Sequence, residues 1–176
     1  MGNARLDEFE QMNKNTIHLK GVVMEDFVNY AKPSLFLITC RCDWKCCHEA
    51  GISTSTCQNE PIAKQLTKEF HIESIYNAFI SNDITKAVVF GGLEPMLQFN
   101  EILSFVKYFR DKGCDSDIVI YTGYYPNELQ NEVAQLKQYP NIILKYGRYK
   151  PNTPSRFDDI LKITLASDNQ YAERIS

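Results

Sequence analysis

The chain has 176 residues, 44% of them hydrophobic and 23% charged, and a formal net charge of −3, which suits one water-soluble globular domain over residues 1–176. The negative charge and the scattered lysines and arginines give no reason to expect a nucleic-acid partner. No apolar run approaches the roughly 20 residues that cross a bilayer, and the polar start lacks a signal peptide's apolar core, so we expect a cytoplasmic protein with no membrane partner.

The first part of the chain predicts two strands and a helix. Residues 1–15 read as a lead-in segment, and residues 17–23 suit a short first strand. After the break at Lys32-Pro33, residues 34–39 form a compact apolar run typical of a buried parallel strand. Further on, Ile72, Ile75 and Phe79 recur at steps of three and four residues, which predicts a crossover helix.

Two further units repeat the order of strand, loop and helix. The first has a strand at 86–90, a loop at 91–95 and a helix at 99–110; the second has a strand at 117–121, a loop at 122–125 and a helix at 126–138. Residues 141–146 and 160–165 suit two more strands. Strands that alternate with amphipathic helices predict right-handed crossovers and a mainly parallel sheet. Because four or five such strands cannot close an eight-stranded barrel, we predict an α/β fold with an open, partial βα barrel.

A cysteine-rich loop follows the strand at 34–39. Five of the six cysteines lie in it, at positions Cys40, Cys42, Cys46, Cys47 and Cys57. Thiols stay reduced in the cytoplasm, which favours ligation of a metal or cluster over a disulfide knot. One interpretation is a non-catalytic binding module in which Cys42, Cys46, Cys57 and either Cys47 or His48 hold a structural zinc, although the paired C-x2-C knuckles typical of such sites are missing.

Another interpretation rests on a family resemblance. Cys42 and Cys46 have C-x3-C spacing, and Cys57 is followed by Gln58 and Asn59, which resembles the C-x3-C-x2-C motif of the radical S-adenosylmethionine (SAM) superfamily. Here a ten-residue insert at 47–56 precedes the third cysteine. The resemblance implies that Cys42, Cys46 and Cys57 hold a [4Fe-4S] cluster. Three thiolates leave the fourth iron open for a substrate, whereas a fully ligated cluster could only pass electrons.

The next loop strengthens this resemblance. Gly91-Gly92-Leu93-Glu94-Pro95 is similar to the superfamily's GGEP motif, with Leu93 as an additional residue. In that family the backbone of the motif receives the amino group of SAM, and bare glycine backbone suits such an approach. The resemblance therefore implies cofactor-binding roles for Gly91, Gly92, Glu94 and Pro95.

Three more segments resemble one branch of the superfamily, the activating protein of anaerobic ribonucleoside-triphosphate reductase. They are Ile120-Tyr121-Thr122-Gly123-Tyr124, Tyr146-Gly147-Arg148-Tyr149 and Ser167-Asp168-Asn169-Gln170. By this resemblance Thr122, Gly123 and Asn59 complete the cofactor site.

The branch also implies an activity. The enzyme would cleave SAM reductively at the cluster to a 5′-deoxyadenosyl radical, using an unidentified one-electron donor, and would install a glycyl radical on a partner such as anaerobic ribonucleotide reductase. An alternative keeps the radical chemistry and takes a small molecule as substrate.

Overall fold

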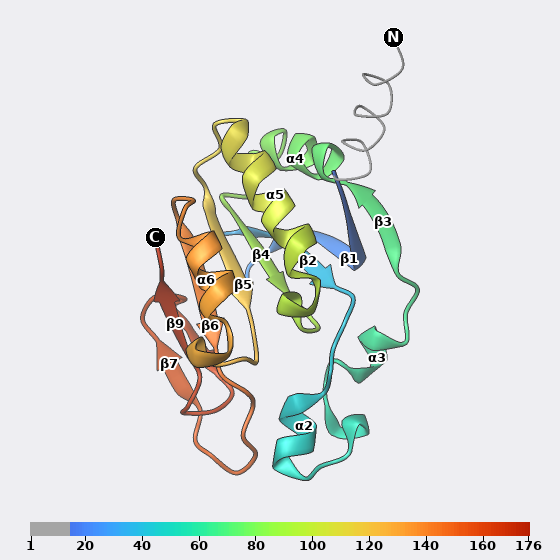
Figure 1. Ribbon diagram of the computed structural model, residues 1–176, viewed down its shortest axis with the longest axis vertical. Helices are drawn as coiled ribbons and strands as arrows, with labels where there is room; N and C mark the ends of the chain where they lie inside the picture. The colour runs from blue at the N-terminus through green and yellow to red at the C-terminus, as the bar shows by residue number, and fades with distance from the viewer. Residues whose placement is uncertain (1–14) are drawn as a thin grey trace.

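The computed structural model describes residues 15–176, and the predicted lead-in at 1–14 lies outside that range. In the described part a seven-stranded sheet carries its longer helices on one face (Figure 1). The sheet order is β3 (Lys68–His71), β1 (Thr16–Asp26), β2 (Ser34–Thr39), β4 (Ala87–Gly91), β5 (Asp117–Tyr121), β6 (Ile142–Tyr146) and β9 (Tyr171–Arg174). The covering helices are α4 (Ile72–Ile80), α5 (Phe99–Asp111) and α6 (Gln130–Leu136).

The centre of the sheet is parallel, as the sequence predicts. β2 pairs in parallel with β4, β4 with β5, and β5 with β6. The strands predicted at 34–39 and 117–121 have the observed bounds, and those at 86–90 and 141–146 differ by one residue. The mixed α/β fold with a mainly parallel central sheet is therefore confirmed, and its description as a partial barrel of the radical SAM type stays a prediction.

The edges of the sheet differ from the prediction. β1 is longer than residues 17–23 and runs antiparallel to both β2 and β3, with irregular register at Leu19/Gly21 and again at Val23/Asp26. It pairs with β3 only over Thr16–Leu19. At the other edge, antiparallel β9 follows β6.

The strand predicted at 160–165 was wrong as a member of this sheet. Residues Ile163–Leu165 form β8, which pairs with β7 (Arg156–Asp158) in a separate two-stranded sheet. The reason is a turn at Asp158, whose carboxylate accepts hydrogen bonds from the backbone amides of Ile160 and Leu161. Alternation in the sequence cannot distinguish a hairpin arm from a sheet strand.

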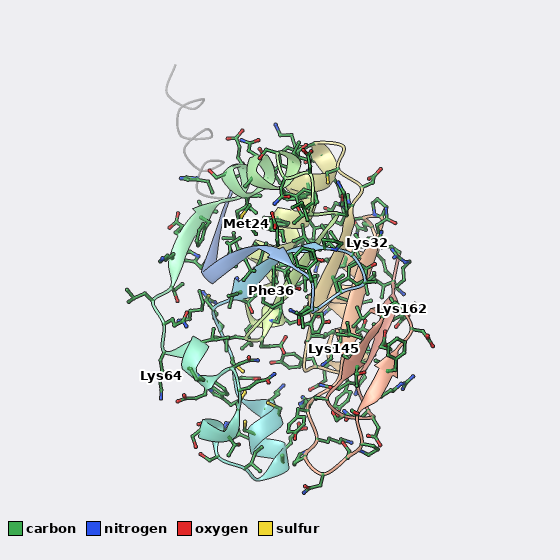
Figure 2. The ribbon with its side chains drawn as sticks, turned by 180° about the vertical axis from the view of Figure 1, so that it is seen from behind. Met24, Lys32, Phe36, Lys64, Lys145 and Lys162 are labelled. Atoms are coloured by element: carbon green, nitrogen blue, oxygen red, sulfur yellow. The ribbon has the colours of Figure 1, made fainter. Side chains whose placement is uncertain are left out.

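The two faces of the sheet pack differently. Alternate side chains of β2 divide between them, so Leu35 and Leu37 lie under the helices while Phe36 and Ile38 point to the opposite face. Under the helices, Phe105 stacks on Phe109 with ring centroids 4.2 Å apart. The opposite face is open to view in Figure 2, where Phe36 and Lys145 are labelled.

The helices also match only in part. The helix predicted at 99–110 is α5, with Ile102, Val106 and Phe109 buried. The helix predicted at 126–138 divides into a 3-10 turn, η3 (Pro126–Glu128), and α6, because Leu129 leaves helical geometry at φ −125°. None of the helices among residues 15–176 combines the length and the apolar character that crossing a membrane requires.

Asp117 forms a clamp at the amino end of β5, far along the chain from the cysteine-rich loop. Its buried carboxylate accepts hydrogen bonds from Tyr30 at 2.9 Å, Lys32 at 2.5 Å and Arg174 at 2.8 Å. Burial alone would raise the pKa of Asp117, but the bonds from Arg174, Lys32 and Tyr30 outweigh it and lower that pKa below its usual range. The clamp thus joins the β1–β2 connection to β9.

We expect this clamp to make the free energy of unfolding depend on pH in the acidic range. A carboxyl group whose pKa is lowered on folding contributes stability above its unfolded pKa of about 3.9, and that contribution is lost as the pH falls through the folded pKa. Asp117→Asn should lower the free energy of unfolding at pH 7 by about 2 kcal/mol, less than for a fully buried pair because Lys32 and Arg174 are half exposed. Denaturant unfolding at pH 7 and pH 3 checks this, and an equal loss at both pH values would contradict it.

Candidate iron-sulfur and cofactor site

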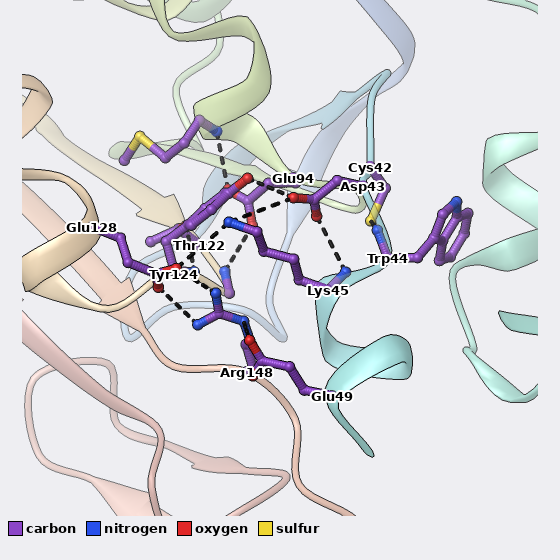
Figure 3. Close-up of polar contacts among 12 residues, drawn as sticks. Cys42, Asp43, Trp44, Lys45, Glu49, Glu94, Thr122, Tyr124, Glu128 and Arg148 are labelled. Carbon is purple, nitrogen blue, oxygen red and sulfur yellow. Dashed lines mark hydrogen bonds and ion pairs between the residues drawn. The ribbon is translucent and has the colours of Figure 1, made fainter. Parts of the chain in front are cut away.

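The cysteine loop, the loop at 91–95 and the loop at 122–123 meet beyond the carboxyl ends of the parallel strands. Glu94 makes both connections, and Figure 3 shows the one from its side chain to Thr122. Its backbone amide donates to the carbonyl of Arg41 at 2.6 Å, next to Cys42. Its carboxylate accepts from the hydroxyl of Thr122 at 2.7 Å and from the amide of Gly123 at 2.8 Å. This edge is where ligands bind in open α/β sheets.

The Glu94 carboxylate is engaged by protein groups. Besides Thr122 and Gly123, the amide of Met96 donates to it at 3.0 Å, and only 7% of the residue is exposed. Burial raises the pKa of Glu94, and the three hydrogen bonds oppose that rise. The predicted cofactor residue therefore acts in this structure as a tie between two loops.

The fold itself requires glycine at two positions of the same loop. Gly92 has φ +87°, a conformation that side chains rarely adopt, and a Cβ there would come within 2.7 Å of Ile38 Cγ2. At Gly91 a Cβ would lie 2.9 Å from the Phe36 ring. Pro95 is buried and opens the 3-10 turn η2 (Pro95–Gln98). A role for these residues in binding SAM stays a prediction.

Local structure inside the cysteine loop was missed from sequence. A short helix, α2 (Lys45–Ala50), carries Cys46 and Cys47, and two more turns follow as η1 (Thr54–Thr56) and α3 (Glu60–Ala63). Trp44 begins α2 in a left-handed conformation with φ 58°, and Gly51 ends it at φ 64°. Gly51 was the available signal, since glycine in this conformation commonly ends a helix.

The thiols are free and partly buried. All six cysteines are unbridged, and the sulfurs of Cys46 and Cys47 are 4.0 Å apart. Burial raises the pKa of Cys42 to about 11. Burial and the neighbouring Cys47 raise the pKa of Cys46 to about 12. These two thiols are protonated at neutral pH in the metal-free protein, so iron binding must release protons.

A cavity of ≈ 430 Å³ lies between the cysteine loop and the C-terminal segment. Cys46, Cys47 and Cys57 line one side, and Tyr149, Ala166 and Gln170 line another. Cys42 lies outside this lining, and Asn59 opens α3, where its carbonyl accepts from the amides of Ile62 and Ala63. Within residues 15–176, no three histidine, cysteine or acidic side chains converge as ligands of a single metal ion.

The donor set fits an iron-sulfur cluster. Clusters of the [4Fe-4S] type take cysteine thiolates as ligands. Each thiolate binds a different iron, so the cysteines must surround a volume and need not converge on one point. The cavity provides that volume with three thiols in its lining. Cys42, Cys46 and Cys57 remain the predicted ligands, with Cys47 placed where it could substitute for one of them.

Polar contacts that the sequence did not predict surround α2. Tyr124 donates its hydroxyl to Asp43 at 2.7 Å, and Lys45 lies 3.5 Å from Glu128 (Figure 3). Arg148 pairs with Glu128 and lies 3.2 Å from Glu49. Two of these residues lie in segments that the family resemblance marked, Tyr124 at 120–124 and Arg148 at 146–149, but the pairings had no sequence signal because the partners are far apart along the chain.

A cavity lined by three free thiols beside an α/β sheet fits the class of proteins that bind an iron-sulfur cluster. Comparison with family models specifies the class: residues 20–170 match the family described as 4Fe-4S single cluster domain. Because the match spans most of the chain, the protein belongs to this family, which is associated with radical SAM proteins. The prediction of a [4Fe-4S] cofactor is thereby supported. No curated protein and no solved structure matches the chain.

Proposed function

We propose that this protein is a radical SAM enzyme that cleaves SAM reductively. The observation that carries the proposal is the convergence of three loops at one edge of the sheet, next to the thiol-lined cavity, with Glu94 joining them. When bound, a [4Fe-4S] cluster held by three thiolates keeps one iron open and supplies one electron there. The chain's own part is to hold the ligands, bind SAM and exclude water.

A buried lysine at this edge of the sheet is suited to bind an anionic group of the cofactor. Lys145 is 7% exposed on β6, and its ammonium donates to the carbonyl of Gly147 at 3.2 Å. Burial lowers the pKa of Lys145 to about 8, although the carboxylate of Glu94 raises it in part. An ammonium has three donors, and burial is costly unless they are paired. The carboxylate of SAM would provide the missing partner, so we assign Lys145 to it.

The substrate side of the proposal is a protein. By the resemblance at 120–124 and 167–170, the partner is a glycyl-radical enzyme of the anaerobic ribonucleotide reductase kind, with a one-electron donor still to be identified. Exposed apolar side chains near one edge of the sheet are consistent with contact to a protein partner: Val23 and Met24 of β1 are each 42% exposed. Phe27, in the β1–β2 connection, is 63% exposed.

Anaerobic reconstitution tests the activity. We expect about four irons and four sulfides per chain, and after reduction with dithionite one 5′-deoxyadenosine per methionine released from SAM. Lys145→Met should keep the iron and weaken SAM binding about tenfold, the loss of one charged hydrogen bond. Lys107→Met, on the exposed face of α5, is the matched control. An iron-loaded, reduced protein that produces no 5′-deoxyadenosine would restrict the cluster to electron transfer.

A further inference from the structure

The helix that carries two of the loop cysteines has little apolar packing. Cys47 is the only buried residue of α2. Hydrophobic burial, which fixes the position of most helices, therefore contributes little here. Polar side chains on either side of α2 must hold it against the rest of the domain.

Those contacts centre on Arg148. Its guanidinium is buried and makes two hydrogen bonds to Glu128, at 2.7 Å and 2.5 Å. The bond from Arg148 lowers the pKa of Glu128 to about 2, so this carboxylate is charged throughout the neutral range. Glu49 of α2 lies 3.2 Å from the Nε of Arg148, and Lys45 of α2 lies 3.5 Å from Glu128. We call Arg148, Glu128, Glu49 and Lys45 the Arg148 latch.

The domain side of the latch is rigidly supported. Two tyrosine rings flank the guanidinium of Arg148, Tyr125 at 4.9 Å and Tyr124 at 5.5 Å. Asn169 donates to the Arg148 carbonyl at 2.8 Å. The α2 side is looser: the buried Nε of Arg148 makes no aligned hydrogen bond within residues 15–176, and Glu49 holds it by proximity of charge alone.

We infer that Arg148 is a positioning residue for the iron-sulfur cluster. It acts through Glu128, Lys45 and Glu49 to fix α2 against the domain, and so sets where Cys46 and Cys47 face the cavity. A displacement of α2 would move the thiols relative to Cys57. The inference rests on placing the cluster in residues 40–57, as the proposed function does, but it needs no cleavage of SAM.

The first test uses metal-free protein, so it depends on no cluster. Hydrogen exchange is measured for the amides of His48, Gly51 and Ile52, which bond within α2 and its end. Glu49→Gln removes the charge on α2 and leaves the Arg148–Glu128 pair intact; these amides should exchange roughly two- to fivefold faster. Arg148→Met should accelerate them more than about tenfold, because it also removes both hydrogen bonds from Arg148 to Glu128 and leaves that carboxylate with the weaker contact to Lys45.

Glu60→Gln is the matched control. Glu60 begins α3, just after the last cysteine of the loop, and pairs at 2.6 Å with Lys64 at the end of that helix; among residues 15–176 it makes no ion pair with the latch. Exchange of the α2 amides should be unchanged in this variant. Unchanged exchange in Glu49→Gln would refute the latch, and because Glu49 is exposed this variant remains informative even where Arg148→Met fails to fold.

The second test follows the loaded protein. Glu49→Gln should release iron to a chelator roughly two- to fivefold faster than wild type and alter the electron paramagnetic resonance spectrum of the reduced cluster, whereas Glu60→Gln should do neither. If Glu49→Gln speeds amide exchange but leaves iron release and the spectrum unaltered, the latch stabilises α2 without positioning the cluster, and the inference is wrong. A wild-type protein that takes up no iron would instead refute the location of the cluster, whatever the exchange shows.

Discussion

Cys42→Ala, Cys46→Ala and Cys57→Ala variants, prepared without oxygen, should each lose the brown colour of the cluster and all SAM cleavage. A [4Fe-4S] cluster with three protein ligands has none to spare, and alanine offers no donor atom. Iron and sulfide content, absorbance and 5′-deoxyadenosine formation measure the result. Cys57 is the informative position, because ten inserted residues separate it from Cys46. Full activity in Cys57→Ala would refute the alignment across residues 47–56.

The remaining cysteines supply the controls. Cys40 donates to the side chain of Gln98 at 3.2 Å, and Cys114 is buried between α5 and β5, so alanine at either position should spare most of the activity. We expect the same of Cys47→Ala. Since Cys47 lines the cavity with Cys46 and Cys57, loss of iron in Cys47→Ala together with its retention in Cys46→Ala would exchange those two assignments.

Glu94→Gln is expected to have the second large effect. The glutamate oxygens accept three hydrogen bonds, and a glutamine amide would present a donor to the hydroxyl of Thr122 or to the amide of Gly123. Leaving a buried donor unpaired costs about 1–3 kcal/mol. We therefore expect a free energy of unfolding about 2 kcal/mol lower. SAM binding should also weaken, because the loop at 122–123, which we call the third loop, loses its hydrogen bonds to Glu94.

Glu101→Gln serves as the control for Glu94→Gln. Glu101 also accepts from a backbone amide, that of His18 at 2.8 Å, but it lies on α5 and does not contact the third loop. The Glu101→Gln substitution should lower the free energy of unfolding and leave the affinity for SAM unchanged. If the two variants lower SAM affinity equally, the tie through Glu94 has no specific role in the cofactor site.

A substitution at Gly92 would be a poor test of whether the loop at 91–95 binds SAM. Gly92→Val would place a side chain against Ile38 in a backbone conformation that favours glycine. It should therefore lower stability whether or not SAM lies there. Lys145→Met is a cleaner probe, because it removes a charge without straining the backbone.

How far the sequence predicted the fold depended on burial. The central strands are continuous apolar runs, such as Ala87–Gly91, and buried strands of this kind are identifiable without tertiary information. β3 and β9 were missed because each has four residues and exposes polar side chains, so neither has an apolar pattern.

The parts of the candidate site also differ in how far the sequence could predict them. Loops that follow successive parallel strands must gather at one edge, so the meeting of the cysteine loop, Glu94 and Thr122 follows from topology. The contacts of the Arg148 latch do not follow from topology. Arg148 and Glu128 are twenty residues apart, and which charges pair is decided by the path of the chain between them.

The edge of the sheet at β1 affects how copies of this protein meet. Beyond Leu19 the outer side of β1 has no strand partner among residues 15–176, and Val23 and Met24 there are partly exposed. An unpaired edge can template association with a second chain. The two register irregularities twist this edge, and Lys20 reaches across it to the carbonyls of Ala63 and Gln65. These features should disfavour edge-to-edge stacking in concentrated solution and preserve discrete monomeric units of the sheet.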